Sequence, residues 1–505
     1  MKIQTIQKTI VAATVLLTMA SCGKEFVTIE PKGQFLSENY YSNQEQAYAA
    51  LVGAYDVLRK NSGGFENMIT MMNAGSDDQY AGGGNSSDGA GIQGFSNFTI
   101  NENTVPGSFW NDHYQGIFRA NTLLARIDAI PMDATLKARY IAECKALRAF
   151  YYFNLVRLFK NVPLLLDPLT TSTMYDAVQA APTEVYTQIE KDLTEAIPNL
   201  PLSISLTTEA GRFSKGAAKA LLGKVYLYDN KKTEAAAQFA EVNGTPGTTS
   251  PMGFKLLTNF SDLWAPANKF NTESILEVLH TDKSNADWGF WGSGADEGNT
   301  VCVMVGPRSY SRPAGSTAPA IPSGWSFNVF TDNFYDFMKG DPRFDATVFN
   351  MKELKATNQA DYIAGYQNSG YFLKKYLPTN ADIRSGGGAQ ELNFKQDSYI
   401  IRLADTYLLE AEALGASGSR AQALLDAVRA RVGLVSIPVN MVNIKNERRR
   451  ELAGEGQRFF DLVRWGDAAT VLSSRGFTAG KNEILPIPQR ELQGTKMKQN
   501  PGYKL

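Results

Sequence analysis

Residues Glu447–Asp467 read ERRRELAGEGQRFFDLVRWGD, which places more charge beside more aromatic rings than any other part of the chain. Gly454 and Gly456 interrupt this pattern, because glycine weakens a helix interior and favours a helix end. We therefore expect two short helices that are joined at these glycines. On the second helix the apolar side chains fall on one stripe, at Phe459, Leu462, Val463 and Trp465.

Charged side chains flank this stripe. Arg458, Asp461 and Arg464 are spaced so that they can pair with each other on one helix. Charge networks of this kind are more often structural than functional. The residues alone thus predict a helical hairpin that docks through its aromatic rings and is held by ion pairs.

The same segment resembles the closing part of the SusD/RagB proteins, surface lipoproteins that capture nutrients for outer-membrane transporters. Further segments look like landmarks of that family in the same order: Ala146–Phe153, Val162–Leu164, Gly340–Phe344, Leu485–Leu492 and Gln499–Tyr503. Two positions depart from the family pattern. Gly454 stands where the family usually has a large apolar residue, and Lys160-Asn161 replaces a glycine before Val162. The departure at Gly454 leaves the local packing open.

Composition sets the class of protein. The chain has 505 residues, of which 43% are hydrophobic and 20% are charged, as in a folded globular protein with an ample core. Its net charge is −1, because the numbers of acidic and basic residues are nearly equal. The sequence therefore shows no excess of basic residues of the kind that binds nucleic acid. The chain has two histidines, His113 and His280, far apart in sequence, and we expect no histidine-based metal or catalytic site. Cys144 is expected as a buried thiol, and the spacing leaves a Cys144–Cys302 disulfide open.

The first residues, 1–21, have the pattern of a bacterial lipoprotein signal. An apolar run at Ile10–Met19 follows two lysines and is too short to span a bilayer comfortably. The run leads into Met19-Ala20-Ser21-Cys22, which resembles a lipobox, so Cys22 is the expected lipid attachment site. The alternative is an ordinary secretory signal with a chance cysteine. Residues 22–42 are expected to tether the body to the membrane.

Helical periodicity begins at residue 43, and residues 43–257 are expected to form an N-terminal helical region. Two helix pairs have the small-residue pattern of tetratricopeptide repeats, whose faces are buried only by stacking on neighbours. We expect them at Ser214–Tyr228 with Thr233–Val242, and at Asp397–Leu414 with Ser419–Val432. The sequence thus predicts a mainly α fold of interrupted tetratricopeptide-like repeats, with a C-terminal region over residues 258–505.

Two long segments break the helical pattern, Ser62–Pro106 and the insertion Thr258–Asn393, and both are rich in glycine and aromatic residues. Loops this long are usually functional or disordered. A GxGxxG match at Gly89–Gly94 follows no strand pattern and is interpreted as chance. Asp77-Asp78 and Asp296-Glu297 lack a defined spacing of Ca²⁺ ligands, so we expect solvated loop charge there, with Ca²⁺ binding left open.

No sequence pattern assigns catalysis. The chain has no HExxH, GxSxG, P-loop or CxxC motif. Carboxylates abound in a chain of this size, so their number neither supports nor opposes a pair for glycoside hydrolysis. We therefore assign no catalytic residue, no cofactor and no metal ligand.

The loops carry aromatic residues that can form a binding surface. Trp288, Trp291 and Trp325 lie in segments rich in glycine and proline and not on amphipathic stripes. Aromatic faces suit the C–H faces of sugar rings. The ligand-binding candidates are led by these three, with weaker ones at Tyr310, Tyr80 and Phe95. The alternative is that such rings anchor loops in small satellite cores.

The resemblance covers nearly all of the mature chain. It implies a SusD-like α–α superhelix whose loop-rich face is built from Ser62–Pro106 and Thr258–Asn393. It implies a non-enzymatic lipoprotein on the outer membrane of a Bacteroidetes-type bacterium, facing the exterior. Family members sit as a lid on a TonB-dependent transporter of the SusC/RagA type, and most of them bind glycans.

Other interpretations stay open. Peptides are the main alternative ligand, as in RagB-like proteins. A surface-anchored glycoside hydrolase and a structural subunit of the transporter without a ligand of its own are the competing classes. One sequence does not name the sugar, because recognition depends on the geometry of the loops.

Overall fold

The computed structural model describes residues 41–504 except 171–172, 285 and 289–296. The expected signal, Cys22 and most of the tether lie outside the described residues, and so does Trp291. Helices dominate the described part, which confirms the predicted mainly α class. Within it, no helix combines the length and the apolar character needed to cross a membrane.

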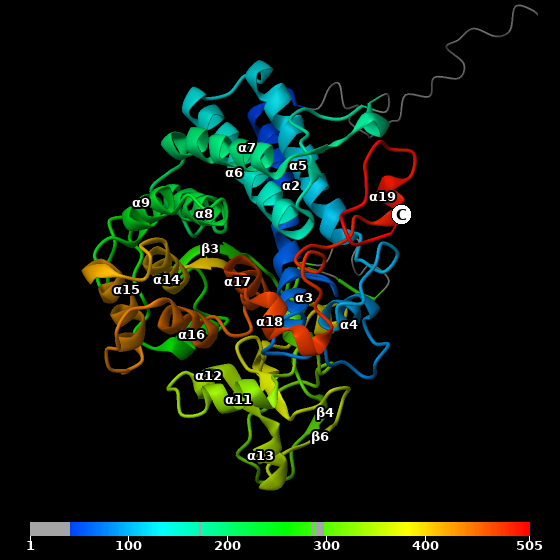
Figure 1. Cartoon of the computed structure of the whole chain (residues 1–505), viewed down its shortest axis with the longest axis vertical. Helices are drawn as coiled ribbons and strands as arrows, with labels where there is room; N and C mark the ends of the chain where they lie inside the picture. Colours follow the sequence, from blue (N-terminus) through cyan, green and yellow to red (C-terminus); the bar gives the residue numbers. More distant parts are fainter. Residues whose placement is uncertain (1–40, 171–172, 285, 289–296, 505) are drawn as a thin grey trace, which may run out of the picture.

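The helices outside the predicted insertion lie in two groups along the sequence. The N-terminal group comprises α2 (Gln44–Tyr55), α3 (Met68–Ala74), α4 (Ala90–Ser96), α5 (Ser108–Arg126), α6 (Ala134–Phe159), α7 (Pro182–Ala196), α8 (Lys215–Tyr228) and α9 (Lys232–Asn243). The C-terminal group comprises α14 (Leu403–Ala413), α15 (Gly418–Arg431), α16 (Met441–Glu451), α17 (Arg458–Trp465), α18 (Ala468–Val471) and α19 (Gln489–Leu492). In Figure 1, α5 and α7 lie at one end of the long axis.

Much of the predicted insertion lies at the opposite end, where Figure 1 shows α11, α13, β4 and β6, whereas its strand β3 lies near the middle of the molecule. Its helices are short: α10 (Val301–Met304), α11 (Asp332–Met338), α12 (Phe344–Thr347) and α13 (Met351–Ala356). The strands of the described residues form four antiparallel pairs: β1 (Val162–Pro163) with β2 (Gln179–Ala180), β3 (Ser274–Val278) with β8 (Ser398–Arg402), β4 (Arg308–Ser311) with β6 (Asp361–Ile363), and β5 (Val348–Asn350) with β7 (Tyr371–Leu373). The lack of long helices predicted for Thr258–Asn393 is therefore confirmed, whereas Ser62–Pro106, also predicted to break the helical pattern, contains helices α3 and α4.

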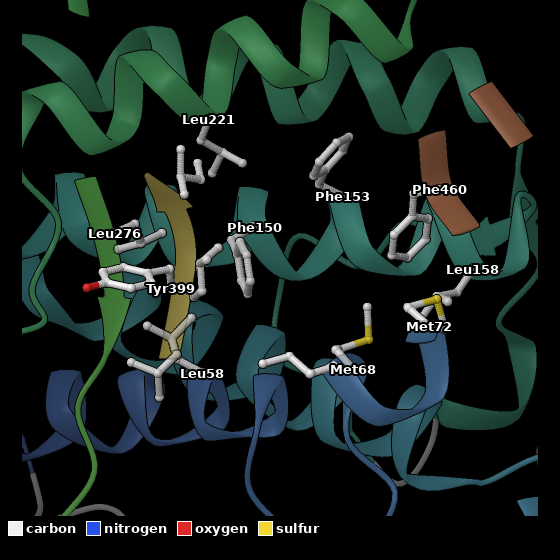
Figure 2. Packing of buried hydrophobic residues seen from close by; sticks show 14 of the residues in the cluster. Leu58, Met68, Met72, Phe150, Phe153, Leu158, Leu221, Leu276, Tyr399 and Phe460 are labelled. Carbon is white, nitrogen blue, oxygen red and sulfur yellow. The ribbon is translucent and has the colours of Figure 1, made fainter. Parts of the chain in front are cut away.

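The core is organised around α6. The side chain of Asp133 caps this helix by accepting the amide N–H of Leu136 at 2.8 Å. Apolar side chains occur on every face of α6, as expected of a helix that is buried on all sides. Figure 2 shows its rings facing three other elements, with Phe150 and Phe153 lying between α3, α8 and α17.

The two predicted repeat pairs form and stack on each other. They are α8 with α9 and α14 with α15, and α9 packs directly on α14. Asn243 of α9 donates its amide N–H to the Glu410 carboxylate of α14 at 2.7 Å, and Thr406 donates to Asn243 at 2.7 Å. One boundary was wrong: Ser398–Arg402, predicted as the start of a helix, is strand β8, because it pairs with β3.

The predicted hairpin is α16 and α17, joined at Gly454 and Gly456, which both have positive φ. A Cβ on Gly454 would lie 2.3 Å from Cδ1 of Leu373, so Leu373 occupies the space of the family's usual apolar side chain. In the α17 stripe Phe459 and Leu462 are buried as predicted. Phe460 is buried too, whereas Val463 and Trp465, also predicted for the stripe, are only half-buried.

The predicted ion pairs of α17 form only in part. Arg464 binds Asp461 at 2.8 Å, as expected from their spacing. Arg458 instead binds Asp77, a residue of the early loop, with Nε 2.8 Å from Oδ1. Cys144 and Cys302 are both buried free thiols, so they are not bridged.

Candidate functional site

The two segments that break the helical pattern lie against each other. The amide of Gly83 donates to the Ser326 carbonyl at 2.8 Å, and the amide of Asn328 donates to the Ala81 carbonyl at 2.9 Å. The amide of Tyr366 donates in turn to the Gly83 carbonyl at 2.8 Å. The early loop is thus hydrogen-bonded between two parts of the insertion, and side chains far apart in sequence meet there.

Glycine makes this close approach possible. Gly82 has φ +73, and a Cβ there would lie 2.2 Å from the Ser326 carbonyl oxygen. Neither the conformation nor the space suits a larger residue. The early loop therefore needs its glycine at this point to reach the insertion.

An aromatic cluster forms where the segments meet, and we define it as Trp288, Trp325, Phe65 and Phe327. The ring centroids of Trp288 and Trp325 lie 5.7 Å apart, with the planes tilted by 36°. Phe65 lies 6.1 Å from Trp325 and meets Phe327 edge to face at 5.2 Å. Trp288 is 51% exposed, Trp325 is half-buried and Phe327 is buried. The cluster therefore runs from the core to the surface and presents Trp288 to solvent.

Polar side chains border the aromatic cluster. The indole N–H of Trp288 donates to Oε1 of Glu391 at 3.1 Å. Arg308 of β4 donates from Nε to the Trp325 carbonyl at 3.1 Å and from Nη2 to Oδ2 of Asp88 at 2.8 Å. Charged and amide groups beside a partly exposed aromatic face suit a ligand that has both C–H faces and hydroxyl groups.

One aromatic residue of this surface was missed from the sequence. Tyr366 is 37% exposed, and its amide is bonded to Gly83 as described above. A Cβ on the preceding Gly365 would lie 3.0 Å from the Cβ of Ser326, the residue after Trp325. The signal was the same as for the tryptophans, namely an aromatic residue beside glycine within the insertion.

Two of the weaker candidates serve small local cores. Tyr310 is half-buried, with its ring 6.1 Å from Phe349 and its hydroxyl donating to the Pro319 carbonyl at 2.7 Å. Tyr80 is half-buried and lies under the Arg475 guanidinium at 5.1 Å. Both rings already have protein partners on one face.

Phe95 corrects the sequence prediction. Its side chain is 3% exposed and meets Phe459 of α17 edge to face at 4.9 Å. Phe95 lies on α4, a helix that covers most of the Gly89–Gly94 match. The ring is therefore part of the main core and is not available to a ligand on the surface.

The acidic pair Asp77-Asp78 was predicted to be solvated loop charge, and this prediction is wrong. Both carboxylates form largely buried ion pairs. Asp77 binds Arg458, and Asp78 accepts from Nε of Arg449 at 2.6 Å. Burial alone would raise the pKa of Asp77, but the hydrogen bonds and charge of Arg458 outweigh it and hold that pKa below its usual value. Asp296 lies outside the described residues.

A hollow lies on the helical body, and we call it the apolar groove. It has a volume of about 650 Å³ and lies between α5, residues 163–169 and 174–177, and the C-terminal residues 490–497. Its rim exposes large apolar side chains, with Phe118 49% and Tyr175 55% exposed. Contiguous apolar surface of this kind marks contact sites on many proteins.

Two family models match the chain. One, described as SusD family, matches residues 327–503, and the other, described as starch-binding associating with outer membrane, matches residues 33–227. A curated relative, SusD-like protein P25 of Formosa agariphila, is 26% identical over 97% of this chain and 97% of that protein.

Solved structures agree with these matches. A laminarin binding SusD-like protein is 60% identical, with a TM-score of 0.90 over 92% of this chain and 100% of that chain. Surface glycan-binding protein A from Bacteroides thetaiotaomicron, solved in complex with laminarihexaose, is 26% identical, with a TM-score of 0.80 over 91% of this chain and 100% of that chain.

Proposed function

Because the chain belongs to the SusD/RagB family, we propose that it captures glycans at the cell surface and does not modify them. The similar proteins are named for starch, laminarin or glycan binding, and none of those names describes a reaction. Capture needs a surface that holds a sugar chain without attacking its bonds.

The aromatic cluster is the observation that supports this proposal most directly. Trp288 and Trp325 bring two rings within 5.7 Å at the surface, so one sugar chain can contact both. Asp88, Arg308 and Glu391 border the rings with groups that bond hydroxyls. Binding residues often lie on loops held by a rigid scaffold, and here the helical body is that scaffold.

Laminarin, a β-linked glucan, is the ligand that we propose. A protein 60% identical to this chain is named for laminarin binding, and a second similar protein was solved with laminarihexaose. The identity to the first is high over 92% of this chain, which supports a shared ligand class. A peptide ligand, the main alternative from the sequence, has no comparable support.

Calorimetry of the mature chain tests the ligand. We expect saturable binding of laminarihexaose and affinity weaker by at least about tenfold, or 1.4 kcal/mol, for maltohexaose and cellohexaose. The absence of saturable binding to laminarihexaose would contradict the proposal. Release of reducing sugar from laminarin during the same incubation would instead favour a hydrolase.

We propose further that Cys22 carries the lipid anchor, on the outer face of the outer membrane. Two or more acyl chains hold a protein firmly on a bilayer, since each buried methylene contributes about 0.8 kcal/mol. Cys22→Ala should therefore move the protein from the membrane fraction to the soluble fraction. A variant that stays on the membrane after a high-salt wash would place the anchor elsewhere.

The partner that we propose is a TonB-dependent transporter of the SusC type, contacted through the helical body. Repeat folds build broad surfaces for partners. The apolar groove, with Phe118 and Tyr175 exposed at its rim, supports this assignment because it offers unoccupied apolar area on that body. A glycan held on the loop-rich face would leave the groove available to the transporter.

A further inference from the structure

One ion pair crosses from the insertion to the early loop beside the aromatic cluster. Arg308 Nη2 lies 2.8 Å from Asp88 Oδ2, although 220 residues separate them. The same guanidinium donates from Nε to the Trp325 carbonyl, and the amide N–H of Arg308 donates to the Ser326 hydroxyl at 3.1 Å. Arg308 therefore bonds the Trp325 backbone carbonyl, the Ser326 side-chain hydroxyl and the early loop at once.

Asp88 is itself held in place. Its carboxylate accepts the amide N–H of Gly84 at 2.6 Å. Its carbonyl accepts from the Gln93 side chain at 3.1 Å, and the same amide group donates to the Gly82 carbonyl at 2.6 Å. These hydrogen bonds hold the turn from Gly82 to Asp88 together without any contribution from Arg308. A fixed carboxylate gives the guanidinium one preferred orientation.

Space around the pair is tight on the side of the turn. A Cβ on Gly84 would lie 3.0 Å from Arg308 Nη2 and 3.1 Å from Asp88 Oδ2. Both charged side chains nevertheless keep about a third of their area in solvent, at 34% and 29% exposed. A surface pair of this exposure contributes little to folding stability, so its geometric effect can be separated from stability.

We propose that Arg308 is a positioning residue of the glycan surface, acting through Trp325, and that Asp88 orients it. Through the Trp325 carbonyl the pair holds the backbone from which the Trp325 ring reaches Trp288, and so keeps both rings available to one sugar chain. This inference rests on the proposed function. Its consequence is a preference for long oligosaccharides, because only a chain that touches both rings depends on their relative position.

The experiment measures chain-length preference. Laminarihexaose and laminaribiose are titrated into wild type, Arg308→Gln, Asp88→Asn and the double variant. We expect the single variants to lose about three- to tenfold in affinity for the hexaose, the size of one aromatic contact, and to bind the biose within about twofold of wild type. The double variant should resemble either single variant, because both remove the same interaction. Arg308→Lys should restore little, since lysine lacks the two-pronged donor.

A matched control and a ligand-free readout complete the design. Lys355 binds Asp361 at 2.7 Å on the same insertion, with both side chains largely exposed, so Lys355→Gln should leave both affinities unchanged. Near-ultraviolet circular dichroism reports the surroundings of all six tryptophans, so the difference between variant and wild-type spectra shows whether the surroundings of Trp325 and Trp288 change. We expect the spectrum to change in the Arg308 and Asp88 variants and not in the control, while the melting temperatures stay close to wild type.

Two results would overturn the inference. The first is wild-type affinity for the hexaose in the Arg308 and Asp88 variants, with an unchanged near-ultraviolet spectrum. The second is an equal loss of hexaose and biose binding accompanied by a large fall in melting temperature, which would make the pair merely structural. If wild type binds no glucan, the proposed function fails, and the near-ultraviolet comparison, which needs no ligand, still decides whether Arg308 positions Trp325.

Discussion

Arg402 Nη1 lies 2.6 Å from Glu451 Oε1, and neither side chain reaches solvent. Arg402 ends strand β8 and Glu451 ends helix α16, so this contact joins the ends of a strand and a helix that are far apart in the sequence. Glu451 also binds Arg343 of the insertion at 2.8 Å. Burial alone would raise the pKa of Glu451, but the surrounding arginines hold that pKa well below its usual value. The carboxylate thus joins the insertion to the helical body as a charged group.

Replacing Glu451 by glutamine should destabilise the fold strongly. The variant would remove the carboxylate that Arg343, Arg402 and Arg431 share, and breaking a buried ion pair in this way typically costs about 3–5 kcal/mol. The free energy of unfolding in urea measures the loss. Glu241→Gln is the matched control, because Glu241 pairs with Lys219 at the surface and should cost less than about 1 kcal/mol. Similar losses in the two variants would contradict the structural role of the buried network.

Trp288→Ala should weaken glycan binding without unfolding the protein. Its ring is half exposed, so its removal leaves no large cavity, and the loss of one stacking contact should lower affinity by about three- to tenfold. Calorimetry with laminarihexaose and a thermal melt measure the two quantities. Tyr175→Ala removes an equally exposed ring from the apolar groove and should bind the glycan as wild type does. Unchanged binding by Trp288→Ala would place the site elsewhere.

Phe95→Ala should show the opposite pattern. Phe95 is buried against Phe459, and phenylalanine-to-alanine changes in cores cost about 3–5 kcal/mol. We expect a large fall in the free energy of unfolding, with glycan affinity close to wild type in the fraction that remains folded. A Phe95→Ala variant that stays stable and loses only glycan binding would contradict the core role of Phe95 and support a role in ligand binding.

Charge placed in the apolar groove should weaken the transporter complex. Phe118→Asp puts a carboxylate at the rim, and desolvating that charge at an interface is unfavourable. Co-purification of the transporter after gentle detergent extraction should fall several-fold relative to wild type, while glycan affinity is retained. Val435→Asp is the control, because Val435 is exposed on the segment between α15 and α16. Equal recovery of the transporter with wild type, Phe118→Asp and Val435→Asp would show that the apolar groove is not part of the interface.

His113 should make stability depend on pH in the acid range. Burial lowers the pKa of His113 to about 4, below its usual 6.5, and the neutral ring donates from Nδ1 to the Phe109 carbonyl at 2.7 Å. Between these values the unfolded chain binds the proton and the folded chain does not. The stabilising contribution is therefore complete above pH 6.5 and is lost as pH falls towards 4, by about 3 kcal/mol.

The comparison of wild type with His113→Gln isolates this effect, because the variant keeps every other titrating group. We expect wild type to lose about 3 kcal/mol more than the variant between pH 7 and pH 4, in urea unfolding measured at each pH. A difference between the two proteins that is the same at both pH values would show that His113 does not titrate abnormally.

The sequence by itself determined the local elements. Glycine placement predicted the junction of α16 and α17, small residues predicted the two repeat pairs, and glycine-rich composition predicted which segments form the loop-rich face. These features depend on propensity and periodicity between neighbours in the chain, which a single sequence records. For the same reason the aromatic residues of the loops could be named as candidates before their positions were known.

Tertiary structure alone decided which of these residues meet. It paired Arg458 with Asp77 across 381 residues instead of with Asp461 beside it on α17. It buried Phe95 on helix α4 and left Trp288 exposed, although the sequence places both in glycine-rich segments. Whether a ring faces the core or solvent, and which ring lies 5.7 Å from Trp325, depends on how distant segments pack. The local propensities of residues do not predict that packing. The free energy of packing comes from burying surfaces that only the folded chain brings together.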